Sequence, residues 1–281
     1  MIFVYLVALL AGILWGITES INKNIIEKKY SSFSYFLIQM GFNVAIYTIP
    51  FLLYGSLSHV PIAYFYLFLP TFFIFLGNLF LIKAYKTDDI SNINILSRAG
   101  LVITFLSGIF LLHETVSLLN VLGVLAVILG ILVIFYEGKA LKPSSGFLFS
   151  LASGVLMGTM AYFRKLALFY FNPISVVFLS HLSLTLILLL LPQSRRHFMP
   201  ILKKYKRKVL VSRITAVVGF YLVIWAIANG NISVVNTNYE TAFLLSTSAI
   251  GIWLLQERKN ITRKLSGSFL CVLGIVLLNF F

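Results

Sequence analysis

The strongest constraint on this chain is a succession of apolar runs, each long enough to cross a lipid bilayer. A helix needs about 20 residues to span a hydrocarbon core about 30 Å thick. The connections are short apart from a basic stretch, QSRRHFMPILKKYKRK, at 193–208. We therefore predict an all-α integral membrane protein with ten transmembrane helices. The expected spans are residues 2–22, 33–55, 62–83, 90–112, 118–136, 146–166, 173–191, 209–228, 232–255 and 265–281.

Composition supports a membrane protein. Of the 281 residues, 60% are hydrophobic and 11% are charged, whereas soluble domains carry about 25% charged residues. The formal net charge is +14, but the basic residues fall between the apolar runs, where they set orientation and contact lipid headgroups. We therefore expect no nucleic-acid partner, and we expect anionic lipid to contact the basic loop at 193–208.

The chain consists of two similar halves. Sliding it against itself by 142 positions places GILWGITESINK (12–23) on GVLMGTMAYFRK (154–165), and this register holds over four spans. The fifth span needs two residues more. We predict two five-helix repeats, residues 1–138 and 143–281.

The second repeat is predicted to be inverted, because an odd number of spans makes it enter the membrane from the opposite side. The even-numbered connections hold only Arg164 and Lys165, and all other loop cations follow odd-numbered spans. Positive residues favour the cytoplasmic side, so the charges predict that both termini lie outside the cytoplasm. The cations after odd-numbered spans are Lys23, Lys28, Lys29, Lys86, Lys139, Lys142, Arg195, Arg196, Lys203, Lys204, Lys206, Arg207, Lys208, Arg258, Lys259, Arg263 and Lys264.

Three segments carry a resemblance to a known family. They are LLAGILWGITESINK in the first span, FLLHETVSLLNVLGVLAVILGILVI across the fourth and fifth, and WLLQERKNITRKLSGSFLCVLGIVLL across the ninth and tenth. With the five-plus-five repeat, the chain resembles an EamA-type member of the drug/metabolite transporter superfamily. The resemblance implies a secondary transporter of the cell (inner) membrane that exports or exchanges small metabolites through a central cavity by alternating access. Members of the family usually have cytoplasmic termini, contrary to the charge pattern here.

Charged residues inside the apolar runs are the main candidates for a site, because each costs about 2.5–3.5 kcal/mol to insert near a helix centre. Arg98 and Glu240 occupy the same position of the two repeats, since 98 plus 142 is 240. Each lies eight residues into its span, about 12 Å from opposite faces, so the two can pair near the midplane. Glu19 lies about 6 Å deep and can compete for the same guanidinium.

Other polar and aromatic residues are expected to line the same cavity. Their spacing of three or four residues places them on shared helix faces, and the aromatic rings suit a cationic group. Two carboxylates with one guanidinium favour an amino acid, an amine or another zwitterion or cation as the substrate. The predicted substrate-binding residues are Trp15, Glu19, Gln39, Asn94, Arg98, His181, Trp225, Asn236, Tyr239 and Glu240.

Each candidate also has a structural interpretation. His181 can be a hydrogen-bonded packing residue, Trp225 an anchor at the membrane interface, and Arg98 with Glu240 a purely structural lock. In the small multidrug members of the superfamily, a glutamate of the first span couples protons to drugs. That position corresponds to Trp15 here, so either Glu19 acts from one turn further on or proton coupling is absent.

The sequence lacks the motifs typical of enzymes and of cofactor or metal sites. It holds no phosphate-binding glycine loop, no HExxH motif and no His/Cys cluster at metal-ligand spacing, so we expect no enzyme, cofactor or metal. Its single cysteine, Cys271, cannot form an internal disulfide. Alternatives to metabolite transport are a flippase for a lipid-linked or amine-bearing headgroup and a non-transporting scaffold subunit. Either a monomer or a homodimer fits the sequence.

Overall fold

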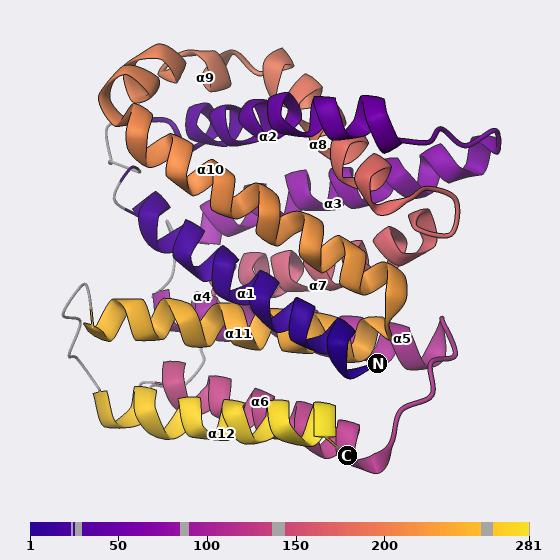
Figure 1. Cartoon of the computed structure of the whole chain (residues 1–281). Coiled ribbons are helices and arrows are strands. Elements are labelled where there is room, and N and C mark those ends of the chain that lie inside the picture. The colour runs from indigo at the N-terminus through magenta and orange to yellow at the C-terminus, as the bar shows by residue number, and fades with distance from the viewer. Residues whose placement is uncertain (24, 26–29, 85–89, 137–143, 254–260, 281) are drawn as a thin grey trace.

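The computed structural model of the chain describes residues 1–23, 25, 30–84, 90–136, 144–253 and 261–280. Within these ranges the side chains of residues 23, 90–92, 94, 253 and 280 are left out of the description. The described chain is helical (Figure 1). Its elements are α1 (Ile2–Lys23), α2 (Ser32–Tyr54), α3 (Pro61–Ala84), α4 (Ile90–Ser97), α5 (Ala99–Phe110), α6 (Leu118–Phe135), α7 (Ser145–Ala167), α8 (Pro173–Leu190), α9 (Pro192–Arg195), α10 (Phe198–Asn229), α11 (Ile232–Trp253) and α12 (Ile261–Phe280).

Eight of the described helices are long and apolar enough to cross a membrane, so the protein is a multi-pass membrane protein. They are α1, α2, α3, α6, α7, α8, α10 and α12. The other two expected spans, 90–112 and 232–255, are not among these eight helices. The first is divided into α4 and α5. The second contains α11, which carries an unusual number of polar residues for its 22-residue length.

Short polar side chains start several of the helices. Ser117 and Asn120 form a reciprocal capping box at the start of α6, with the Asn120 N–H donating to Ser117 Oγ at 3.1 Å. The Asn172 side chain accepts from the Ser175 N–H at 2.9 Å, and Pro173 opens α8. These caps satisfy amide groups that have no partner within the helix, which fixes where each span enters the bundle.

The repeat is visible in the packing of the helices. A Cβ built on Gly219 of α10 would lie 3.2 Å from the Leu14 Cβ of α1, and one on Gly77 of α3 would lie 3.7 Å from the Leu156 Cβ of α7. Both glycines and both leucines are related by the 142-residue shift. The contact of α1 with α10 therefore repeats that of α3 with α7.

The fifth helices of the two repeats, α6 and α12, pack against each other at one edge of the bundle (Figure 1). A Cβ on Gly130 would lie 2.6 Å from the Gly267 carbonyl oxygen, and a Cβ on Gly123 would lie 2.9 Å from that of Gly274. Only glycine permits such a close approach of two backbones. Because α6 and α12 pack against each other at the edge, the centre of the bundle is formed by the other helices.

The predicted span at 90–112 is not continuous. It divides at Arg98, where the Arg98 N–H donates to the Ile95 carbonyl at 3.2 Å and the Leu101 N–H donates to the Arg98 carbonyl at 2.9 Å. These bonds span three residues, as in a 3₁₀ turn. Gly100 follows, a poor helix former whose missing side chain lets the Gly154 backbone approach. The break is a correction to the expected single helix.

The basic stretch at 193–208 is also not the loop expected. It forms α9 and the first turns of α10, with a kink at Tyr205 (φ −119°, ψ 19°). Ile201 and Val209 are 1% and 0% exposed and pack in a cluster with Ile38. Helical spacing therefore buries an apolar stripe while leaving the basic side chains at the surface.

Two charged side chains hold the turn between α10 and α11. Lys165, expected in a connection, lies in α7, and its Nζ donates to the carbonyls of Ile227 at 2.5 Å and Gly230 at 2.9 Å. Glu114 accepts from the N–H groups of the first two residues of α11, at 2.5 and 3.0 Å, and from the Ser233 hydroxyl at 2.6 Å. Each charge has the sign that complements its helix end.

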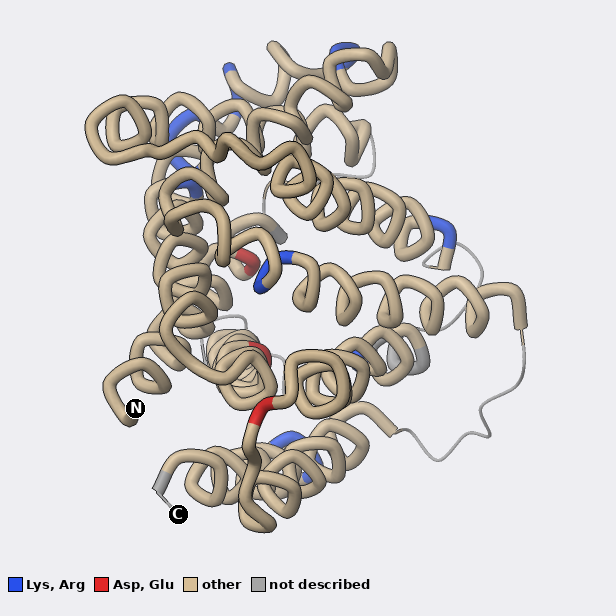
Figure 2. Tube along the Cα trace, turned by 90° about the vertical axis from the view of Figure 1, so that its right-hand side faces the viewer, with Lys and Arg blue, Asp and Glu red and all other residues tan. Residues whose placement is uncertain are grey.

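Figure 1 shows the two ends of the chain close together at one end of the bundle. Figure 2, viewed from that side, shows that the body of the bundle holds few charged positions, and that red and blue segments nevertheless occur near its centre. The interior therefore contains charges that need an explanation.

Candidate functional site

A cavity of about 540 Å³ lies in the interior of the bundle, within the range of small-molecule sites. Its wall is made by residues of α1, α2, α3, α4, α5, α7, α8, α10 and α11, together with Arg98 at the break between α4 and α5. Both repeats therefore contribute, and the edge pair of α6 and α12 is absent from the described wall. The cavity lies between the repeats, as the resemblance to transporters implies.

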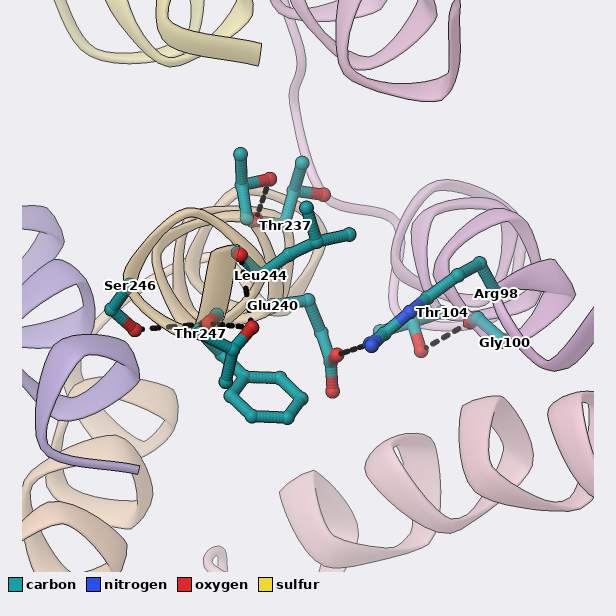
Figure 3. Close-up of polar contacts among 10 residues, drawn as sticks. Arg98, Gly100, Thr104, Thr237, Glu240, Leu244, Ser246 and Thr247 are labelled. Carbon is teal, nitrogen blue, oxygen red and sulfur yellow. Dashed lines mark hydrogen bonds and ion pairs between the residues drawn. The ribbon is translucent and has the colours of Figure 1, made fainter. Parts of the chain in front are cut away.

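Arg98 and Glu240 line this cavity and form an ion pair with each other (Figure 3). Arg98 Nη1 donates to Glu240 Oε2, and the guanidinium carbon lies 5.3 Å from the centre of the Phe243 ring. The two side chains are 21% and 28% exposed. The pair therefore belongs to the wall and is open to the cavity, while Arg98 Nε is buried and has no hydrogen-bond partner among the described residues.

Glu19 lines the same cavity but contacts a different group. Its Oε1 accepts from Asn22 Nδ2 at 3.3 Å, and Asn22 Oδ1 in turn accepts from the Tyr35 hydroxyl at 2.5 Å and from Arg213 Nη2 at 3.3 Å. The expected competition with Glu240 for Arg98 is not present in this conformation. Glu19 instead belongs to a buried polar network between α1, α2 and α10.

Arg213 was missed by the sequence reasoning. It is 1% exposed and lies in α10, where its Nη2 donates to the Ser212 hydroxyl at 2.6 Å. It lies four residues after the start of the span predicted at 209–228 and was assigned no role from the sequence. The repeat register offered a signal, because Arg213 corresponds to Thr71, which lines the cavity from α3.

Arg164 was placed in a connection and is instead part of the cavity wall. It lies one turn before the end of α7, is 6% exposed, and its guanidinium carbon is 5.0 Å from the centre of the Phe220 ring. The predicted span ended at residue 166, so Arg164 was counted as a cation at the membrane surface. In the repeat register Arg164 corresponds to Asn22, so an interior polar position recurs in both halves.

Most of the other predicted residues also lie in the wall. Trp15, Gln39, His181, Asn236 and Tyr239 all line the cavity. On α11, the residues at 236, 239, 240 and 243 follow the spacing of one helix face. The Nδ1 atom of His181 lies 2.7 Å from the Val177 carbonyl oxygen, so that nitrogen carries a hydrogen and the other ring nitrogen is left for a different partner.

Two predicted residues are not part of the wall as described. The side chain of Asn94 lies outside the described residues. Trp225 packs edge-on against Phe3, with 5.9 Å between ring centres. The described cavity-facing residues of α10 are Phe220, Val223 and Ile227, and Trp225 falls on another face of that helix. The expected aromatic wall is therefore formed by Trp15, Phe220 and Tyr239 instead of Trp225.

Comparisons with known proteins agree with this architecture. The model of the EamA-like transporter family matches residues 2–136 and 144–280. One solved structure, described as the crystal structure of a protein, is 16% identical and superposes with a TM-score of 0.80 over 99% of this chain and 96% of its own. That likeness shows a shared fold alone. No curated protein matches the chain. The two matched segments together span nearly the whole sequence, so this protein belongs to the EamA-like transporter family, within the drug/metabolite transporter superfamily.

Proposed function

We propose that this protein is a secondary transporter of a small polar metabolite, with an amino acid, an amine or another zwitterion or cation favoured. Its family consists of membrane transporters, and its cavity has the volume and mixed lining of a small-molecule site. In this proposal the chain crosses the membrane ten times, with α4 and α5 together forming one span. The two repeats are inverted, and substrate binds between them near the midplane.

The observation that carries the proposal is the ion pair of Arg98 and Glu240. A purely structural lock would be shielded from ligands, whereas these side chains are 21% and 28% exposed and line the cavity. They also come from corresponding positions of the two repeats. A substrate in the cavity can therefore compete with this pair directly.

Alternating access follows if the pair forms in one conformer and opens in the other. We propose that Arg98 exchanges Glu240 for Glu19 as the repeats rock, and that Asn22 and Arg213 hold Glu19 in the conformer described here. Each pairing then favours one access state, and a substrate shifts the balance by its different affinity for the two.

The proposed orientation places the basic ends of the helices in the cytoplasm and both termini outside, in the cell (inner) membrane. Exposed cations of α9 and α10 then face anionic headgroups, each worth about 1 kcal/mol near such a surface. These cations are Arg195, Arg196, Lys203, Lys204, Lys206, Arg207 and Lys208. Neutralising the four lysines and arginines at 204 and 206–208 should reduce retention of phosphatidylglycerol over phosphatidylcholine during purification, and unchanged retention would contradict the contact.

The test of transport is solute flux in proteoliposomes that contain the purified protein. Vesicles loaded with a mixture of amino acids, amines and other small polar metabolites should lose one class faster than protein-free vesicles do. The matched variants are Glu240→Gln and the exchange Arg98→Glu with Glu240→Arg, which reverses the pair. Loss in the first and partial recovery in the second are expected. Equal flux from vesicles with and without the protein, for every solute class, would contradict the proposal.

A further inference from the structure

Arg164 differs from the other interior arginines in its partners. Arg98 has Glu240, and Arg213 has Asn22 and Ser212. Among the described residues, no carboxylate or carbonyl accepts a hydrogen bond from Arg164; its guanidinium lies against the Phe220 ring. At 6% exposure the side chain is nine-tenths buried, yet it lines the cavity. It is a buried cation directed at an interior space.

We propose that Arg164 is an anion-binding subsite of the cavity, and that it takes the carboxylate or a similar planar anionic group of the transported molecule. The inference deepens the proposed function by naming part of the substrate. Arginine stays protonated in proteins and presents its N–H donors in a fork that matches a carboxylate. A ligand that brings the missing negative charge relieves the cost of an unpaired buried cation.

Tyr239 supplies a second donor to the same subsite. Tyr239 lines the cavity from α11, as Arg164 does from α7, and no described residue forms a hydrogen bond with its hydroxyl. A phenol hydroxyl that faces a cavity without a protein partner is available to a ligand. The guanidinium and the phenol therefore offer donors to the cavity from two helices, α7 and α11.

The neighbouring groups also favour an anion. His181 uses Nδ1 to bond the Val177 carbonyl and packs its ring at 4.7 Å from Phe220, so this side chain brings no negative charge to the subsite. The carboxylates of the described wall, Glu19 and Glu240, have their own partners in Asn22 and Arg98. An amine without an acidic group leaves Arg164 uncompensated, so a zwitterion fits this cavity better than a simple cation.

Tryptophan fluorescence gives a test that does not depend on transport. The chain has three tryptophans, and changing Trp225 and Trp253 to Phe leaves Trp15, whose ring lies 6.2 Å from that of Phe220. The probes are leucine, the amine that lacks its carboxyl group, and the acid that lacks its amino group. Leucine and the acid should change Trp15 fluorescence, and the amine should bind at least about tenfold more weakly.

Substitution of Arg164 identifies the group responsible. Arg164→Gln should weaken binding of leucine and of the acid by about tenfold or more, and Arg164→Lys should recover part of the loss. Arg263→Gln, the same change on α12 outside the described cavity wall, should bind as the unchanged protein does. If Arg164→Gln fails to fold, Tyr239→Phe removes only the hydroxyl of the subsite and should still weaken both carboxylate probes.

The outcomes separate this inference from the proposed function. Tight amine binding, unchanged acid binding in Arg164→Gln, or no binding of any carboxylate probe to the unchanged cavity each overturns the subsite. Binding that depends on Arg164 supports it, even if proteoliposomes move no class of solute, a result that would contradict transport alone. Flux of leucine that is indifferent to Arg164→Gln would uphold transport and reject the subsite.

Discussion

Replacing Glu240 by glutamine should destabilise the conformer described here and impair transport, because Arg98 loses its counter-charge. Removing one partner of a fully buried pair costs about 3–5 kcal/mol. The two side chains are 21% and 28% exposed, which reduces that cost. Glutamine still accepts a hydrogen bond from Arg98, and a bond to a charged group is worth about 1.5–3 kcal/mol. We therefore expect a net loss of about 1–3 kcal/mol, or a shift of about 5- to 150-fold between access states.

The shift can be measured by the accessibility of a single cysteine in the cavity. The position Asn78 lines the wall from α3, and a cysteine there, with Cys271 changed to Ala, can be labelled from either face with an impermeant thiol reagent. Glu240→Gln should alter the ratio of labelling rates from the two faces and reduce flux. Glu240→Asp, which keeps the charge, is the matched control. Unchanged flux and unchanged labelling in Glu240→Gln would refute the role given to the pair.

Three further predictions test other parts of the account. Glu19→Gln should shift the labelling ratio opposite to Glu240→Gln with little loss of thermal stability, because the amide still bonds Asn22; a shift in the same direction contradicts partner exchange. Gly130→Leu should destabilise the protein by about 1–3 kcal/mol, because its side chain would meet the Gly267 backbone within 2.6 Å; an unchanged melting temperature contradicts that contact. A cysteine at Lys204 should resist impermeant reagents in intact cells, and ready labelling would show the opposite orientation.

The helices and the central pair could be predicted because each rests on a periodic or repeated signal. Apolar runs of about 20 residues indicate spans whatever their neighbours are. The repeat register places Arg98 and Glu240 at equivalent positions of the two repeats. Both residues lie about eight residues inside their spans, where a charged side chain is costly unless it faces the interior of the bundle. Depth and register together therefore sufficed to predict an ion pair between helices distant in sequence, and the structure shows that pair.

The ends of the spans were harder to interpret. Arg164 and Arg213 lie within a turn or so of predicted boundaries, where hydropathy cannot tell a headgroup-level cation from a buried one. Whether such a cation is buried depends on the neighbouring helices. Phe220 packs against Arg164, and Asn22 accepts a hydrogen bond from Arg213. The same limit explains Trp225, whose helix face is set by the packing of α10.

Local backbone geometry was also beyond the sequence reasoning. The break at Arg98 depends on the approach of α7 at Gly100, and the span around it reads as one apolar run. The basic stretch at 193–208 has loop-like composition, but Ile201 and Val209 pack on the interior and make it helical. In both places a tertiary contact outweighs local composition.

The most direct test of the central claim is a block of the cavity itself. Met160 lines the cavity from α7, whereas Val155 lies on an exposed face of the same helix. With Cys271 changed to Ala, a cysteine at 160 should support flux of small polar metabolites in proteoliposomes until a bulky maleimide is attached, and flux should then fall to that of protein-free vesicles. A cysteine at 155 should be insensitive to the same reagent. Full flux after complete modification at 160 would contradict transport through this cavity.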